Sequence, residues 1–293
     1  MRILITILHH WNPNGGGRHQ SLRSNPLPRI QALQSLILAF TRFGSNQFHL
    51  NLEDQAAYPA NISKSVHIDL HVLTDGKNHV LDQLDNSFNA CIERVASAVE
   101  QPLMLGFKAQ QHLALNLSDQ YDLYGYFEDD VIVHDPYFFL KVKRFAEYLG
   151  AQNVLLPQRY ELMSHPSSLN KLYIDGQLPR HDINELIPSP PPSVLMLDGL
   201  LGPISFESPS NPHAGCFVLT HQQLHFWTQQ PWWQDQDCGF VSPLESAATL
   251  GLLKSFKLYK PSFANASWLE VEHWGSGFLT LMARATRKKS TNK

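Results

Sequence analysis

Three adjacent carboxylates, Glu128, Asp129 and Asp130, lie between two apolar runs of this sequence, residues 123–127 and 131–133. A buried carboxylate without a partner is costly, and three together repel one another unless a cation lies among them. Closely spaced carboxylate oxygens are ligands that Mg²⁺ and Mn²⁺ prefer. The spacing therefore predicts a metal site at the carboxyl end of a central strand, where open α/β sheets bind their ligands. The alternative is a solvated turn at the end of a strand.

The elements that must position these acids follow from the apolar periodicity of the chain. The pattern alternates between strands and helices, which is typical of a wound, mostly parallel sheet flanked by helices in the α/β class. Residues 43–64 and 158–212 lack periodicity, and the second segment contains a Pro-Ser-Pro-Pro-Pro run at 188–192. The predicted strands are 3–8, 65–73, 123–127, 153–157, 214–220 and 257–260, and the predicted helices are 30–40, 91–99, 108–117, 138–149, 221–228 and 242–253.

The composition is that of a globular protein. The chain has 293 residues, of which 43% are hydrophobic and 17% charged, and its net charge of −3 gives no indication of nucleic-acid binding. Its three cysteines, Cys91, Cys216 and Cys238, have no metal-binding spacing and are expected to be reduced thiols. No apolar stretch approaches the roughly 20 residues that span a bilayer.

These features predict a cytoplasmic protein without a transmembrane segment. The apolar N-terminal run is too short for a signal peptide and is better interpreted as a first strand. The basic tail, residues 281–293, is predicted to be disordered. A solubilising role for the tail is favoured over peripheral contact with an anionic membrane surface.

With an acidic triplet in mid-chain, a glutamate opening a late helix and a histidine near the C-terminus, the chain resembles the nucleotide-diphospho-sugar transferases, the glycosyltransferase superfamily with the GT-A fold. In that family a DxD-type motif holds Mn²⁺ or Mg²⁺ against the donor diphosphate. The matching residues here are Glu128-Asp129-Asp130, with Glu in place of the first Asp. The resemblance implies one GT-A-like domain over residues 1–280, with a nucleotide-binding half at 1–157 and an irregular acceptor half at 158–280.

The same resemblance implies a ligand set for the metal and for the donor nucleotide. Asp130 is expected to bind the metal directly, Glu128 to contact the metal or the ribose, and His273 to supply the last ligand. Leu8 and His9 are expected to line the base pocket, beside Asp75 and Asp129. An arginine fork suits phosphate oxygens, and Arg18, Arg23 and Arg29 are all open possibilities for the diphosphate, as they are for solvated surface positions.

Catalysis and acceptor binding are expected from the second half of the chain. Glu245 is the predicted general base, although a glutamate three residues after Ser242 is also what a helix cap requires. Asp237 and the neighbouring Asp235 are the competing bases. Trp232 and Trp233 are predicted either to stack on a sugar or to pack in the core. Gly215 is expected to let the acceptor approach the backbone, with His213 as a further acceptor contact.

The sequence thus predicts a metal-dependent glycosyltransferase that moves a sugar from a nucleotide diphosphate donor to a hydroxyl of a glycan, a lipid or a small molecule. One alternative is a sugar nucleotidyltransferase, which the absence of a lysine in the glycine-rich loop after the first strand disfavours. The other is a catalytically silent nucleotide- or carbohydrate-binding protein with the same fold, because fold alone does not fix function.

Overall fold

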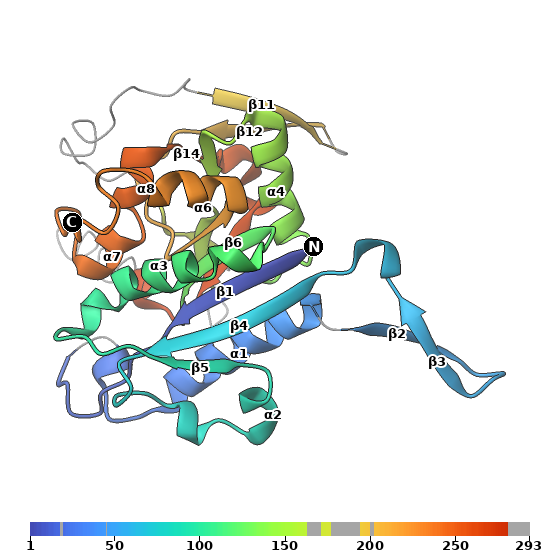
Figure 1. Cartoon of the computed structure of the whole chain (residues 1–293), viewed down its shortest axis with the longest axis horizontal. Helices are drawn as coiled ribbons and strands as arrows, with labels where there is room; N and C mark the ends of the chain where they lie inside the picture. Colours follow the sequence, from blue (N-terminus) through green and yellow to red (C-terminus); the bar gives the residue numbers. More distant parts are fainter. Residues whose placement is uncertain (18–19, 45, 163–170, 177–193, 200–201, 281–293) are drawn as a thin grey trace, which may run out of the picture.

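A five-stranded sheet forms the centre of the molecule, with its strands in the order β13-β6-β1-β4-β5 (Figure 1). The computed structural model describes residues 1–17, 20–44, 46–162, 171–176, 194–199 and 202–280. Strands β1, β4, β5 and β6 are parallel, and only β13 is antiparallel to its neighbour β6. The predicted wound α/β sheet is therefore confirmed. The strands are β1 (Arg2–Leu8), β4 (His67–Thr74), β5 (Glu93–Ala96), β6 (Leu123–Glu128) and β13 (Cys216–Thr220).

Helices cover both faces of this sheet. Strand β1 is buried from Ile3 to Leu8, as expected for a central parallel strand with a nearly continuous apolar sequence. Its odd-numbered isoleucines join a core with α1 (Leu27–Gly44) and α4 (Phe138–Leu149). Leu4 and Leu8 join a second core with α3 (Leu105–Leu115), α6 (His221–Thr228) and α8 (Leu250–Ser255). The central sheet thus separates two apolar cores.

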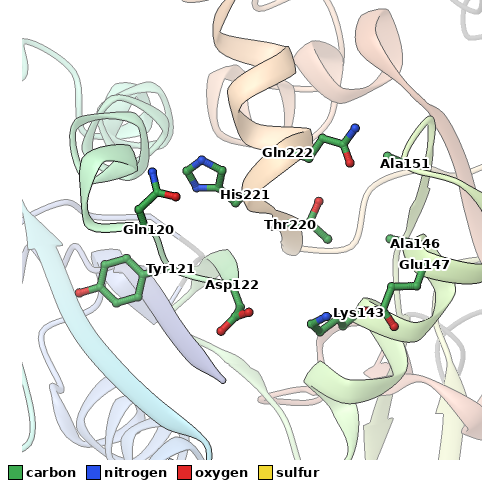
Figure 2. A pocket seen from close by; sticks show the side chains of 10 residues that line it. All are labelled: Gln120, Tyr121, Asp122, Lys143, Ala146, Glu147, Ala151, Thr220, His221 and Gln222. Carbon is green, nitrogen blue, oxygen red and sulfur yellow. Dashed lines mark hydrogen bonds and ion pairs between the residues drawn. The ribbon is translucent and has the colours of Figure 1, made fainter.

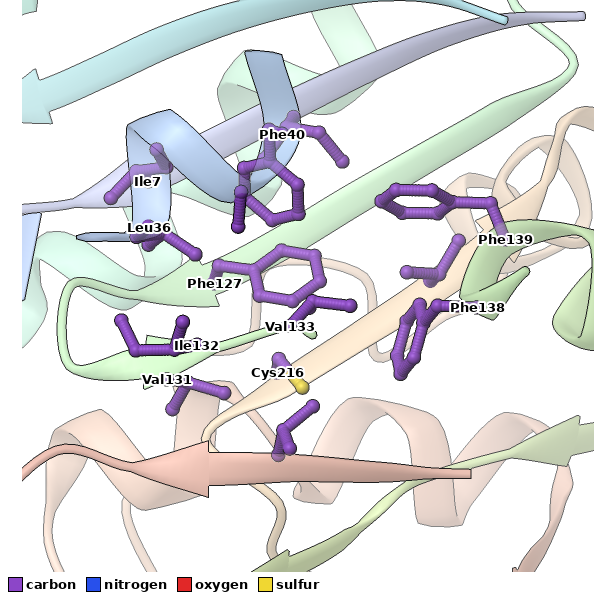
Figure 3. Close-up of a cluster of buried hydrophobic side chains, with 14 of the residues drawn as sticks. Ile7, Leu36, Phe40, Phe127, Val131, Ile132, Val133, Phe138, Phe139 and Cys216 are labelled. Atoms are coloured by element: carbon purple, nitrogen blue, oxygen red, sulfur yellow. The ribbon is translucent and has the colours of Figure 1, made fainter. Parts of the chain in front are cut away.

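The first core lies directly behind the acidic triplet. Figure 3 shows Phe127, the residue before the triplet, against Phe40 of α1, and their rings meet edge to face at 5.1 Å. Val131, Ile132 and Val133, which follow the triplet, are also fully or almost fully buried in this core. Apolar packing on both sides of the triplet therefore fixes the backbone that carries the three acids.

Two four-stranded sheets lie beside the central one, and the first of them ties the late chain to the short strand after the triplet. Their orders are β10-β9-β15-β7 and β11-β12-β14-β8. Strand β15 pairs antiparallel with β7, the short strand after the triplet, so that His273 lies opposite Val131. The strands are β7 (Val131–Ile132), β8 (Asn153–Leu155), β9 (Gln158–Leu162), β10 (Lys171–Tyr173), β11 (Val194–Gly199), β12 (Gly202–Glu207), β14 (Lys257–Pro261) and β15 (Glu270–His273).

The structure differs from the predicted elements in three places. The predicted helix 91–99 is wrong, because residues 93–96 form β5, which pairs with β4 at the edge of the central sheet. The predicted helix 242–253 is interrupted at Thr249, whose φ of −135° is not helical, and forms α7 (Pro243–Ala247) and α8. The stretch 43–64, predicted to be irregular, contains a hairpin of β2 (Gln47–Asn51) and β3 (Ala56–Ala60).

The segment 158–212 also differs from the expectation. Its described parts form strands β9, β10, β11 and β12, although the sequence shows no periodicity there. The run at 188–192, Arg18 and the basic tail lie outside the described residues. One short helix, α2 (Asn86–Asn89), completes the described α-helices. Within the described part of the chain, no helix is both long enough and apolar enough to cross a membrane.

Candidate functional site

The acidic triplet lies where the strand order of the central sheet reverses. From β1 the chain proceeds through β4 to β5 on one side, and β6 then pairs on the other side of β1. The carboxyl ends of β1 and β6 therefore lie at the point of the sheet where open α/β proteins bind ligands. His9 follows β1, Asp75 follows β4 and the triplet closes β6. The topology thus brings three of the predicted donor-binding segments to one edge of the sheet.

Asp129 and His9 hold the two central strands together at this edge. His9 is fully buried, and its Nδ1 lies 2.5 Å from Asp129 Oδ2. The backbone N–H of Val80 donates to His9 Nε2 over 3.0 Å. Because Nε2 accepts a hydrogen bond, Nδ1 must carry the proton and donate to Asp129. Burial of the ring and the positive charge of Arg29 hold the pKa of His9 well below its ordinary value, so His9 is neutral. Both ring nitrogens of His9 are therefore occupied by protein groups.

Arg29 lies between two of the acids. It stands in the first turn of α1 and is almost completely buried. Its Nη2 contacts Asp129 Oδ1, and its Nη1 lies 3.0 Å from Asp130 Oδ2. The guanidinium thus offsets part of the negative charge of Asp129 and Asp130, and its contacts to a donor diphosphate stay a prediction.

Glu128 has a different environment from the other two acids. Its backbone N–H donates to the carbonyl of Gly215, whereas its buried Oε1 has no hydrogen-bond partner. Burial and the nearby charge of Asp130 raise the pKa of Glu128 to about 7, although Arg159 lowers it. A buried carboxyl with an unpartnered oxygen is a group that a cation or a hydrogen-bond donor of a substrate would stabilise.

Gly215 permits the close approach of β13 to Glu128. Its φ is +63°, and a Cβ at this position would lie 2.8 Å from a Val131 methyl carbon and 3.1 Å from Glu128 Oε2. Both the left-handed backbone and the contact distance therefore require glycine. The group that lies close to Gly215 here is Glu128, and the approach of an acceptor to this glycine stays a prediction.

A network of buried charges lies beneath Glu128. Asp175 accepts hydrogen bonds from Arg159 Nε at 2.9 Å and from Lys260 Nζ at 2.7 Å. Burial alone would raise the pKa of Asp175, but Lys260 and Arg159 lower it to about 2. Lys260 also donates to the carbonyl of His213, whose Nε2 lies 3.9 Å from Glu128 Oε1. The network therefore positions His213 and adds positive charge near Glu128.

Sequence reasoning missed Arg159, Asp175 and Lys260. One indication was available, because Lys260 is a lone charge in the apolar run Leu-Tyr-Lys-Pro, and fully buried lysines are almost always paired. The partner of Lys260 is not visible in the sequence, since Asp175 is 85 positions away.

Strand β15 returns His273 to the acidic triplet. His273 Nδ1 lies 3.1 Å from Oε1 of the fully buried Glu161, which also accepts from the backbone N–H of Leu279. The neighbouring Trp274 N–H donates to the carbonyl of Asp130 over 2.7 Å. Burial would lower the pKa of His273, but the bond to Glu161 and the charge of Asp130 raise it. His273 thus lies within electrostatic reach of the acids.

These groups do not form a ready-made metal cage. Across the described ranges, no three or more side chains of histidine, cysteine, aspartate or glutamate are grouped closely enough to hold a metal ion. Glu128, Asp130 and His273 influence one another's charge, yet they supply at most part of a coordination shell. Magnesium is commonly bound in this incomplete way, through one or two carboxylates together with substrate phosphates.

The two predicted bases have different surroundings. Glu245 stands in the first turn of α7, and its Oε2 accepts a hydrogen bond from the Ser242 hydroxyl, which makes no capping bond to the helix backbone. Burial and then the charge of Asp130 are the main causes of the raised pKa of Glu128, and the negative charge of Glu245 raises this pKa further. Asp237 is instead held by Lys254, 2.7 Å away, and this bond lowers its pKa.

The remaining predicted contacts have structural roles in the described chain. Asp75 accepts from the backbone N–H groups of Lys77 and Asn78 and thereby closes the turn after β4. Leu8 is buried in the second core. Trp233 packs edge to face on the buried Trp227 at 4.9 Å, and Trp232 donates to Ser255. Contact of either tryptophan with an acceptor sugar stays a prediction.

Two cavities lie away from the triplet. One, of about 380 Å³, is lined by Tyr121 and Asp122 before β6, by Thr220 at the end of β13 and by His221 at the start of α6 (Figure 2). These positions lie at the amino end of β6, whereas the acids lie at its carboxyl end. The second, of about 620 Å³, lies between α4 and the strands β11 and β12. Neither cavity is lined by the predicted site residues.

Comparisons with known proteins give limited information. No protein-family model matches the chain, and no curated protein matches it. Among solved structures, the chain is similar to TarS residues 1–349 of S. aureus in complex with UDP-GlcNAc, with 9% identity and a TM-score of 0.41 over 90% of this chain and 56% of that one. It is also similar to CMP:2-keto-3-deoxy-manno-octonic acid synthetase complexed with CTP, with 13% identity and a TM-score of 0.38 over 99% and 100% of the two chains. Both similarities are too weak to give the chain a family or an activity.

Proposed function

We propose that this chain is a glycosyltransferase that transfers a sugar from a nucleotide diphosphate donor to an acceptor hydroxyl. The observation that carries the proposal is the position of Glu128, Asp129 and Asp130 at the carboxyl end of β6, beside the reversal of strand order. The carboxyl end of the strands at such a reversal is where the nucleotide of an α/β protein is expected to bind. Strand β15 adds His273 from the far end of the chain to the same place.

The side chains near the triplet could supply only part of the coordination shell of a hard divalent cation, and the phosphates of the donor would complete it. Glu128 has an unpartnered buried oxygen, Asp130 carries a second carboxylate, and His273 donates Nδ1–H to Glu161, which leaves Nε2 as a ligand. A carboxylate that orients a ligating histidine in this way is typical of metal sites. We therefore propose Glu128, Asp130 and His273 as ligands of Mn²⁺ or Mg²⁺. Such an ion, when bound, neutralises the diphosphate and stabilises the departing nucleoside diphosphate.

The protein's own residues would then have distinct roles. Arg29 fixes the carboxylates of Asp129 and Asp130, and His9 links them to β1. Glu245 is proposed to accept the proton of the acceptor hydroxyl, and a base in this role would give inversion at the sugar carbon. Asp237 is the second choice, because its ion pair with Lys254 stabilises the carboxylate and weakens it as a base.

The experiment that tests this function is an assay of nucleotide products. The protein is incubated with Mn²⁺, a panel of nucleotide sugars and simple glycan acceptors, and the released nucleotide is identified by chromatography. We expect nucleoside diphosphate from one donor class. We expect Glu245→Gln to lower kcat by about 10²–10⁴-fold, as loss of a general base does, with little change in the KM for the donor. The exposed Glu207 provides the matched control, Glu207→Gln.

Other results would redirect the assignment. Pyrophosphate formed from a nucleoside triphosphate and a free sugar would indicate a sugar nucleotidyltransferase instead. Binding of a donor without any product would indicate the catalytically silent protein. Full activity of Glu245→Gln would remove Glu245 from the mechanism and leave Asp237 to be tested.

A further inference from the structure

A two-stranded hairpin projects from the body of the molecule, away from the candidate site (Figure 1). It is formed by β2 and β3, which pair antiparallel from Gln47 opposite Ala60 to Asn51 opposite Ala56. Figure 1 shows it extending beyond the end of β4, where it meets no other labelled element. An isolated hairpin of two strands is only marginally stable in water. Further contacts, beyond those within the hairpin, are therefore needed to stabilise its folded form.

One face of this hairpin is apolar along its length. Cross-strand partners point to the same face, and the register places Phe48 opposite Pro59 and Leu50 opposite Ala57. All four side chains on this face are exposed, and Phe48 and Leu50 retain 60% and 66% of their accessible surface. Leu52, at the turn, retains 79%. Contiguous exposed apolar surface of this kind marks an interaction site.

The opposite face and the turn are internally bonded. His49 stacks on Tyr58 with the ring centres 5.9 Å apart. Asp54 accepts hydrogen bonds from Asn51 Nδ2 at 2.7 Å and from the Tyr58 hydroxyl at 3.0 Å. The hairpin is therefore a formed, amphipathic unit, whose polar face is bonded within itself and whose apolar face is exposed.

We propose that this apolar face is a dimer interface that packs against the same hairpin of a second copy of the chain. The four residues of the face carry no charge, so two identical faces meet without like-charge repulsion. A two-fold axis through this face would place the same apolar patch of both copies in contact, as in the commonest soluble oligomers. The mutual burial also supplies the apolar contact that a lone hairpin lacks.

The charges of the arm disfavour other partners. Residues 46–60 contain no lysine or arginine, and the turn carries Glu53 and Asp54. Nucleic acids and anionic bilayers recruit proteins through basic residues, so an arm with an acidic tip is not matched to either. An uncharged copy of the same face is the partner that the observations favour.

The test is the mass of the intact protein by sedimentation equilibrium, over about 1 to 200 µM, the range in which a small apolar interface dissociates. We expect a concentration-dependent dimer. The variant Phe48→Ser/Leu50→Ser is expected to dimerise at least about tenfold more weakly, since it loses the two largest anchors. The control is Leu115→Ser, which removes a leucine that is more exposed than Phe48 or Leu50, at the end of α3, and is expected to dimerise like the wild type.

Two further readouts make the outcome unambiguous. Circular dichroism checks that the body of each variant is folded, and hydrogen exchange of the amides at 47–60 in the wild type is expected to slow as concentration rises. A monomer at every concentration, or a dimer that the double substitution leaves unchanged, would overturn the proposal. Binding of a monomer to phosphatidylcholine vesicles that depends on Phe48 and Leu50 would also overturn it and assign the face to a lipid surface.

Discussion

Arg29→Ala is expected to destabilise the protein by about 3–5 kcal/mol, the usual effect of removing one partner of a buried ion pair. Arg29 is almost completely buried and is the cation that lies against both Asp129 and Asp130. Without it, two carboxylates would stand side by side at the rim of the core. The free energy of unfolding in urea measures the effect directly.

Two comparisons show whether uncompensated charge is the cause. Arg42→Ala changes an exposed arginine on the same helix and should alter the stability by no more than about 0.5 kcal/mol. Combining Arg29→Ala with Asp129→Asn and Asp130→Asn should recover most of the lost stability, because the repulsion disappears with the charges. A triple variant as unstable as Arg29→Ala alone would mean that the arginine acts by filling space.

Glu128→Gln is expected to stabilise the protein at pH 8 and to abolish sugar transfer. Burial and Asp130 raise the pKa of Glu128 in the folded protein from 4.5 to about 7. Below pH 4.5 the carboxyl is protonated in both the folded and unfolded states, and folding does not force an unfavourable charge into the core. Between these two pKa values the folded protein holds more protons than the unfolded chain, so its stability falls as pH rises. A shift of this size corresponds to at most about 3 kcal/mol at pH 8.

The difference in unfolding free energy between wild type and Glu128→Gln isolates this group. We expect the two proteins to be nearly equal at pH 4 and the variant to be more stable at pH 8. Glu100→Gln, at an exposed position, should show no such pH dependence. A Glu128→Gln variant that is less stable than the wild type at pH 8 would show that the ionised carboxylate is already stabilised by protein groups.

The strands and helices with continuous apolar patterns could be predicted from the sequence. Strand β1, helix α4 and helix α6 lie where the periodicity placed them, and the acidic triplet closes β6 as expected. Strands β5, β9 and β10 could not be found in this way because they are three to five residues long and contain charged side chains, whereas the equally short β8 and β13 are mostly apolar. A run of that length has no distinct period, and its structure is decided by the strand with which it pairs.

The candidate site was predictable in position but not in its supporting contacts. The acids, His9 and His273 are recognisable by residue type. The partners that set their charge are distant in sequence: His9 meets Asp129 across 120 positions, and Arg29 meets Asp130 across 101. Because a local pattern carries no information on such pairs, Arg29 was indistinguishable from a phosphate-binding or surface arginine before the fold was known.

The most direct test of the proposed site is calorimetric titration of nucleoside diphosphates and nucleotide sugars into the wild type and Asp130→Asn, each with and without Mn²⁺. Asparagine keeps an oxygen that can accept from Arg29 but loses the charge, and Asp198→Asn serves as the exposed control. We predict Mn²⁺-dependent binding with a Kd between about 1 µM and 1 mM, the usual range for enzyme substrates, which Asp130→Asn abolishes and Asp198→Asn preserves. Two results would contradict the proposal that these acids form a donor site. One is that no nucleotide binds with or without Mn²⁺, and the other is that binding depends on neither the metal nor Asp130.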